Sequence, residues 1–257
     1  MPIWLAELSV TIVLVATSEL AFRFARRRSR KDAGKDLGTT QASTLGLLAL
    51  VLGFTLAMAE SRFSSRRQVV LDESLAVGTT YLRTDFLPEP QRSRSKLLLR
   101  EYIDARIAFY STEEATPRSQ ALQTRLWAEL AAVASTHDTP LLGTYVTSLN
   151  QMIDLEAARD LILAARVPWT IHLLVLVVAF VAIGINGYAV GLGRIRIPIS
   201  LTVVPLLVAF SYSVLLDLDR SRAGLISTGD RPMERLKQSL PSIPGTSSAR
   251  VPGRSSW

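Results

Sequence analysis

The chain has 257 residues, of which 48% are hydrophobic and 20% are charged, and its formal net charge is +7. It contains no cysteine, which excludes disulfides, thiolate metal sites and a cysteine nucleophile. The charged residues avoid four apolar stretches and gather between them. The basic excess therefore indicates attraction to anionic lipid at a membrane surface, and we expect no nucleic-acid partner.

The four apolar stretches approach the length of about 20 residues that a helix needs to cross a bilayer. We predict transmembrane helices at residues 1–22, 42–59, 167–192 and 195–216. The segments between and after them are a basic loop at 23–41, a helical extramembrane domain at 60–166 and a C-terminal tail at 217–257. The tail is rich in Pro, Gly and Ser and is predicted to be disordered from about residue 240. The predicted fold class is an all-α membrane protein, with four transmembrane helices in a 2+2 arrangement around a helical extramembrane bundle.

The first span is predicted to be an anchor, because its basic cluster follows it, whereas a signal peptide carries positive charge in front. Arginine greatly outnumbers lysine, as in proteins of GC-rich bacteria, so we expect a multi-pass protein of a bacterial inner membrane. Lys and Arg are almost equally numerous on the two sides of the spans. The positive-inside rule therefore leaves open on which side residues 60–166 lie.

The second span is predicted to continue beyond the membrane as one long helix, which Pro88 and Pro90 end. Further helices are expected from about residue 92, from Pro117 and from Pro140. Apolar residues recur in them at helical spacing, which is typical of a helix bundle.

Two patterns of small residues predict close helix packing in lipid. In the second span Ala49, Gly53 and Ala57 repeat every four residues. In the third span Gly187 and Gly191 form a GxxxG pattern. Both sets are candidate helix-packing residues.

The adjacent ridge of the second span carries Leu50, Phe54 and Met58. A ring of such side chains around a pore would form a narrow apolar constriction that gates by dewetting, so these three are the pore-lining candidates. The spacing alone favours the alternative that they face lipid or another helix.

Beyond the membrane, one side of the same helix is polar and the other apolar. The polar stripe consists of Arg62, Arg66, Glu73, Thr80 and Arg83, and the apolar side of Val70, Leu71, Leu75, Val77, Tyr81 and Leu82. We expect this stripe to be solvated and the apolar side of the helix to pack in the bundle. An ion-facing vestibule is the less favoured alternative.

Catalytic motifs are absent from the sequence, and we predict no enzyme activity and no cofactor. An enzyme would need a pocket that gathers Glu73, Asp154 or Asp217 around a substrate. Asp217 and Asp219 are weak candidates for binding a hard cation. Ion pairs with Arg62 or Arg66 are the favoured role of these two aspartates.

The two histidines, His137 and His172, are too few for a histidine-based metal centre.

Four stretches carry a pattern shared with a known family: LVLGFTLAMAESRFSSRRQVVLDESLAVGTTYLRTDFLPEP, LLLREYIDAR, LNQMIDLEAAR and LDLDRSRAGLI. Over roughly residues 42–236 the chain resembles the bacterial bestrophin-like membrane proteins. The chain departs from the expected pattern at Ser221, where we expect proline. Bestrophins proper are pentameric anion channels with an apolar neck on the second transmembrane helix.

The resemblance implies a homo-oligomer, a pentamer by family analogy, that conducts small inorganic ions through the bilayer. Leu50, Phe54 and Met58 then become approximate neck candidates. The helical domain of bestrophins is cytoplasmic. If the first helix sets the orientation, the basic loop at 23–41 is cytoplasmic and residues 60–166 lie outside, so the two indications conflict. We therefore expect one of two functions. The protein is an anion or ion channel, or it is a non-conducting membrane scaffold or stress-signalling protein that acts through its helical domain.

Overall fold

The structure is a computed structural model that describes residues 3–28, 37–108, 115–136, 139–193, 199–219 and 231–241. Its α-helices are α1 (Ile3–Arg28), α2 (Leu37–Arg83), α3 (Gln91–Ala108), α4 (Ala115–Ala134), α5 (Pro140–Ala164), α6 (Trp169–Leu192), α7 (Val204–Asp219) and α8 (Arg231–Ser239). A 3-10 turn, η1 (Thr84–Phe86), follows α2, and a π-helical turn, η2 (Ile199–Val203), precedes α7. These ranges contain no strand, and the predicted all-α class is confirmed.

Four helical segments are long and apolar enough to cross a membrane: Glu7–Arg27, Leu37–Phe86, Pro140–Leu192 and Ser200–Asp219. The chain divides into two compact units. The first unit consists of Met1–Gln68 and Asp160–Thr228, and the second unit of Val69–Arg159 and Gly229–Trp257. Helices α2 and α5 contribute residues to both units.

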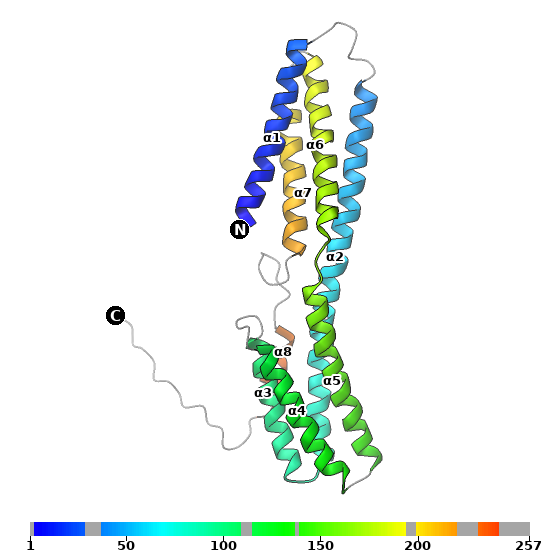
Figure 1. The fold of residues 1–257 in the computed structure, drawn as a ribbon, viewed down its shortest axis with the longest axis vertical. Helices are drawn as coiled ribbons and strands as arrows, with labels where there is room; N and C mark the ends of the chain where they lie inside the picture. Colours follow the sequence, from blue (N-terminus) through cyan, green and yellow to red (C-terminus); the bar gives the residue numbers. More distant parts are fainter. Residues whose placement is uncertain are drawn as a thin grey trace, which may run out of the picture. The chain divides into compact units, whose positions relative to one another are not determined.

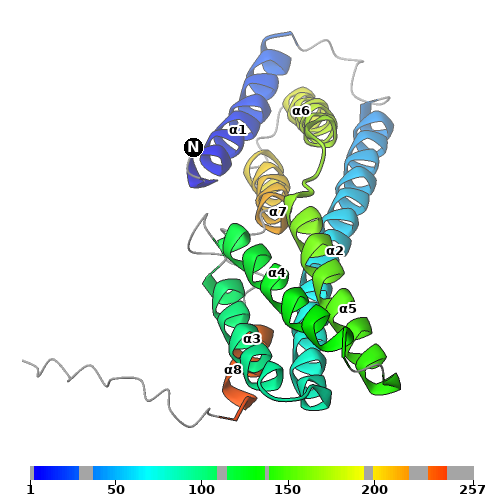
Figure 2. The ribbon, with the colours of Figure 1, turned by 60° about the horizontal axis from the view of Figure 1, so that its bottom comes forward.

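In the first unit, α1, α6, α7 and the first part of α2 lie side by side (Figures 1 and 2). Their apolar faces meet in a buried cluster to which all four helices contribute: Leu14, Leu48, Ala179, Ala182, Ile183, Val208 and Ala209. A second cluster surrounds Ala59 and Tyr212. Many other large apolar side chains of these helices point outward. An outward apolar surface of this kind suits a lipid environment or contact with further protein chains.

In the first unit, polar side chains form hydrogen bonds where the regular backbone hydrogen bonds of the helices are interrupted. The buried Asn186 amide donates to the Ser200 carbonyl at η2 (3.0 Å) and accepts from the Gln41 amide (2.8 Å). Between α5 and α6, Pro168 has an extended ψ of 136°, which stops the helix. The freed backbone N–H of Val167 donates to Asp219 (2.7 Å). In lipid such groups must be satisfied internally.

The second unit is a bundle built from the end of α2 with α3, α4, α5 and α8. Its core holds fully buried side chains from each of these five helices, among them Val77, Tyr102, Leu126, Met152 and Met233. Helices occupy the stretches where apolar periodicity predicts them. The predicted tail also contains α8, and Leu236 of α8 lies close to Gly78 of α2.

Candidate functional site

The pore-lining candidates of α2 all point away from the core of the first unit. Leu50 is 55% exposed, Phe54 68% and Met58 40%. They follow one another at intervals of four residues, so they form one ridge of the helix. The ridge carries no charge, and neighbouring helices of the same chain leave it uncovered.

The small-residue ridge of α2 is uncovered as well. Ala49, Gly53 and Ala57 are exposed, and a Cβ added to Gly53 would meet nothing within 4 Å. Helix α2 packs into its own unit through another side, which includes Leu48 and Ala59. Both ridges therefore remain available to lipid or to another chain.

The GxxxG residues of α6 lie at a tight helix contact. A Cβ at Gly187 would stand 2.3 Å from the backbone oxygen of Ser18, and one at Gly191 would stand 2.6 Å from that of Phe22. Both oxygens belong to α1. Only glycine allows the two backbones to approach this closely.

Arg66 of α2 ties together the ends of two other helices in the first unit. Its guanidinium donates to the Ala165 carbonyl just after α5 (2.8 Å) and to the Leu218 carbonyl at the end of α7 (3.0 Å). It also lies 3.9 Å from the Asp219 carboxylate. Carbonyls at helix ends lack an intrahelical partner and carry partial negative charge, so a buried guanidinium satisfies them and is itself stabilised.

Asp219 occupies this junction as an ion-pair partner, which confirms the favoured pairing with Arg66. Its carboxylate also lies 4.0 Å from His172, whose ring is 3.4 Å from the Tyr212 hydroxyl. Asp217 is partly buried and lies two residues before the end of α7. Within the described ranges, no group of three or more His, Asp or Glu residues is placed to hold a metal ion. His137 and Ser221 lie outside the described residues.

The expectation of a solvated polar stripe on α2 is wrong for three of its five residues. Arg66, Glu73 and Thr80 are buried. On the apolar side, which was expected to pack in the bundle, the outcome is mixed: Val70, Val77 and Tyr81 are buried, whereas Leu71, Leu75 and Leu82 are exposed. The polar side turns inward because it has charged partners on other helices, which the sequence of α2 alone does not reveal.

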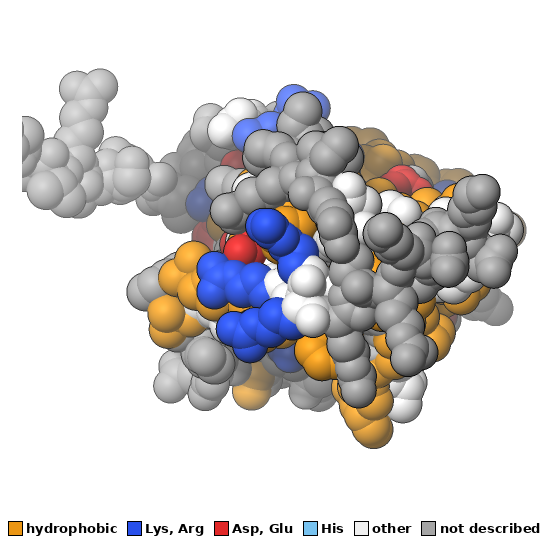
Figure 3. All heavy atoms as spheres, turned by 90° about the horizontal axis from the view of Figure 1, so that it is seen from above, with side chains coloured by type: hydrophobic (Ala, Val, Ile, Leu, Met, Phe, Trp, Pro, Cys, Tyr) orange, Lys and Arg blue, Asp and Glu red, His pale blue; other side chains and the backbone are white. Residues whose placement is uncertain are grey.

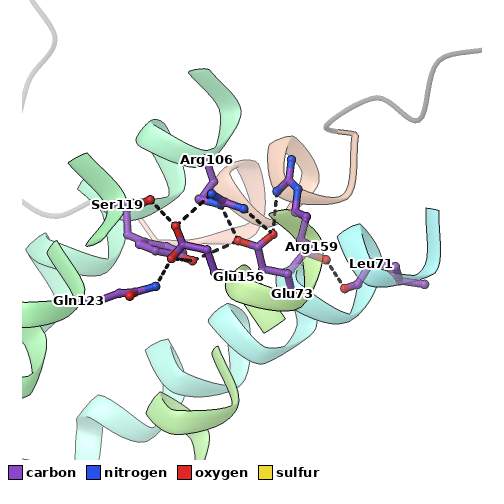
Figure 4. A network of polar contacts seen from close by, with 9 residues as sticks. Leu71, Glu73, Arg106, Ser119, Gln123, Glu156 and Arg159 are labelled. Atoms are coloured by element: carbon purple, nitrogen blue, oxygen red, sulfur yellow. Dashed lines mark hydrogen bonds and ion pairs between the residues drawn. The ribbon is translucent and has the colours of Figure 1, made fainter. Parts of the chain in front are cut away.

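Those partners form a buried network in the second unit, which we call the four-charge network: Glu73, Arg106, Glu156 and Arg159 (Figure 4). Arg106 donates to Glu73 (Nε to Oε1, 2.7 Å) and to Glu156 (Nη1 to Oε1, 3.1 Å). Arg159 donates to the other oxygen of Glu73 (2.7 Å). Two carboxylates thus balance two guanidiniums, as burial of charge requires.

Neutral side chains complete the four-charge network. The Tyr102 hydroxyl lies 3.1 Å from both Glu73 and Glu156 and donates its single proton between them. Ser119 and Gln123 of α4 donate to Glu156. Burial raises the pKa of Tyr102 well above 10, and the two carboxylates raise it further, so the phenol stays protonated. Four helices are joined in this way.

Glu73 and Asp154, two of the acids that an enzyme would need, have different surroundings in the second unit. Glu73 is enclosed by Arg106 and Arg159, and Asp154 lies exposed on α5. One sequence signal pointed to the network: Arg106 follows Tyr102 by four residues, on the face of α3 that is otherwise apolar. An arginine there needs a buried acid.

The chain has four helical segments of membrane-spanning length and an additional helical bundle. These features define the class of multi-pass membrane proteins. More specifically, residues 9–233 match the model of the Bestrophin-like domain, and the chain belongs to this family. A search of curated proteins found no match.

Solved structures share the fold. A crystal structure of a bacterial bestrophin homologue from Klebsiella pneumoniae, carrying a single substitution, superposes with a TM-score of 0.67 at 13% identity. The match covers 90% of this chain and 98% of the Klebsiella chain. A second structure of the Klebsiella homologue, phased on zinc, gives a TM-score of 0.64 at 12% identity, with coverages of 92% and 99%. A crystal structure of a membrane protein gives 0.67 at 13% identity, with coverages of 91% and 96%.

Proposed function

We propose that the protein is a homo-oligomeric ion channel whose constriction is formed by Leu50, Phe54 and Met58 of α2. The observation that carries the proposal is the exposure of this uncharged ridge in a helix that is otherwise anchored in its unit. Family membership supports it, because the resemblance to bestrophins implies an oligomeric, anion-conducting assembly with an apolar neck on the second transmembrane helix.

The two neighbouring ridges of α2 suit a ring of helices. In a helix, consecutive residues are about 100° apart, so Ala49, Gly53 and Ala57 lie beside the large side chains. Small residues on that flank would let the next copy of α2 approach closely. The large side chains would then face the axis, where an apolar ring excludes water until the pore opens.

The proposal places the protein in a bacterial inner membrane as a pentamer, with small inorganic ions as its substrate. Residues 60–166 would form the extramembrane domain. Because the chain has no cysteine, single cysteines introduced into that domain would report its side of the membrane in intact cells.

The test is halide flux through liposomes that contain the purified protein, with the oligomer verified in the same sample. We expect flux above that of empty vesicles. An intact oligomer that passes no halide, under several pH values and membrane potentials, would overturn the proposal.

The second candidate function is a non-conducting scaffold or signalling protein that acts through the second unit. Leu71, Leu75 and Leu82 form an exposed apolar line on α2 that would suit a partner protein. Capture of a specific partner that these leucines are required to bind, in an oligomer without flux, would favour this function over the channel.

A further inference from the structure

The end of α1 carries three arginines on one side of the helix. Arg23, Arg26 and Arg27 are exposed and spaced three and four residues apart, so their side chains are neighbours. Figure 3, which looks onto the molecule from the end where α1 and α6 finish, shows Lys and Arg side chains gathered next to apolar ones. We call these three residues the arginine cluster.

Two members of the arginine cluster are available to an external anion. Arg23 is paired with Glu19 at 2.9 Å. In the part of the chain that the structure describes, no carboxylate lies within ion-pair distance of Arg26 or Arg27. The Arg26 guanidinium lies over the Phe22 ring, 5.7 Å from its centroid, which orients it without neutralising it.

Aromatic residues beside the cluster are of the kind that favours a membrane interface. Phe24 packs against Tyr188 of α6, with ring centroids 6.4 Å apart, and tyrosine and tryptophan favour the headgroup region. Trp169, at the opposite end of α6, is 72% exposed. Tyr188 follows Trp169 by 19 positions, which corresponds to about 28 Å of helix, close to the roughly 30 Å of a hydrocarbon core.

An apolar stripe leads directly to the cluster on the same helix. Val13, Leu20 and Arg27 recur every seven residues, so they share one side of α1, and Phe24 lies beside them. Val13, Leu20 and Phe24 are exposed. An acyl chain lying along this stripe would bring its headgroup phosphate to Arg27, with Arg26 within reach.

We propose that α1 holds an anionic phospholipid, with the acyl chain on Val13, Leu20 and Phe24 and the phosphate on Arg26 and Arg27. Guanidiniums bind phosphate oxygens through paired, charge-assisted hydrogen bonds. The uncompensated positive charge selects an anionic lipid over a zwitterionic one. This site is independent of whether the protein conducts ions.

The test is lipid retention, measured by native mass spectrometry on the full-length protein after equal exposure to phosphatidylglycerol and phosphatidylcholine. The variant R26Q/R27Q leaves the Arg23–Glu19 pair intact. The control R94Q/R125Q removes the same charge from exposed positions on α3 and α4. We expect the wild type and the control to prefer phosphatidylglycerol, and R26Q/R27Q to lose that preference on the order of tenfold.

Equal preference in R26Q/R27Q and the wild type would overturn the proposal. So would displacement of the lipid by millimolar inorganic phosphate, because that result would identify a site for the free anion. If R26Q/R27Q does not fold, R26K/R27K replaces it: this variant keeps the charge and must keep the preference, and the preference must weaken as salt rises.

Discussion

The Arg66 guanidinium lies 3.9 Å from the Asp219 carboxylate. It also donates a hydrogen bond to the carbonyl of Leu218, a residue 152 positions later in the sequence. The same guanidinium reaches the carbonyl that follows α5. One side chain of α2 thereby fixes the ends of α5 and α7 within the first unit.

Replacement of Arg66 by methionine should destabilise the first unit by about 3 kcal/mol, because two helix-end carbonyls and Asp219 would lose their buried partner. The adjacent Arg67 is exposed and provides the matched control. R67M should change the free energy of unfolding by less than about 0.5 kcal/mol. Thermal unfolding in detergent compares the two, and equal melting temperatures would show that the junction contributes nothing.

In the four-charge network, E73Q should cost more stability than E156Q. Glu73 accepts from both Arg106 and Arg159, whereas Glu156 receives one guanidinium and several neutral donors. Loss of the Glu73 charge removes the carboxylate that both buried guanidiniums contact, at a cost of about 3–5 kcal/mol. Chemical denaturation of the two isosteric variants measures the order. The opposite order would mean that the neutral donors dominate the network.

Alkaline pH should destabilise the wild type more steeply than Y102F. The folded-state pKa of Tyr102 lies well above its ordinary value of 10.0, mainly because of burial. The folded protein therefore holds this proton more tightly than the unfolded chain. The resulting stability is fully present below pH 10 and is lost as the pH rises through the raised pKa.

Melting temperatures of both proteins, followed from about pH 9 to pH 11, test this dependence on the phenol proton. Y102F starts from a lower stability because it lacks the hydroxyl, so the slopes are compared. Parallel slopes would contradict a raised pKa.

Alanine at Gly187 should destabilise the contact between α1 and α6 by about 1–3 kcal/mol, because the new Cβ would overlap the backbone of Ser18. G53A is the control, since a Cβ there meets nothing within the chain. Alanine favours a helix over glycine, so G53A should leave the fold of one chain as stable as before or slightly more so. A melting temperature of G187A equal to that of G53A would refute the tight contact.

Sequence patterns predicted the helical class, the stretches that form helices and the pairing of Arg66 with Asp219, because each depends on local periodicity or on charges near a span. Burial of Glu73 was not predictable in this way. Its partners Arg106 and Arg159 lie 33 and 86 positions away, on other helices. An isolated acid on an amphipathic helix is usually solvated, and only the assembled bundle supplies the compensating charge.

The sequence of one chain also does not determine what the two α2 ridges contact. The spacing of Leu50, Phe54 and Met58 favours contact with lipid or another helix, although an apolar pore wall also selects uncharged side chains. Their exposure narrows the choice to lipid, another chain or a pore. These surroundings differ in access to water, which is measurable.

The most direct test of the central claim is therefore halide flux in liposomes before and after a charged, water-soluble thiol reagent. F54C is the test variant, and L8C, whose side chain is exposed on α1, is the control in a chain that has no other cysteine. We predict flux in both variants and a change in flux on modification of F54C alone. An intact F54C oligomer that conducts halide but does not respond to the reagent, or a wild-type oligomer that never conducts, would contradict the assignment of α2 as the pore helix.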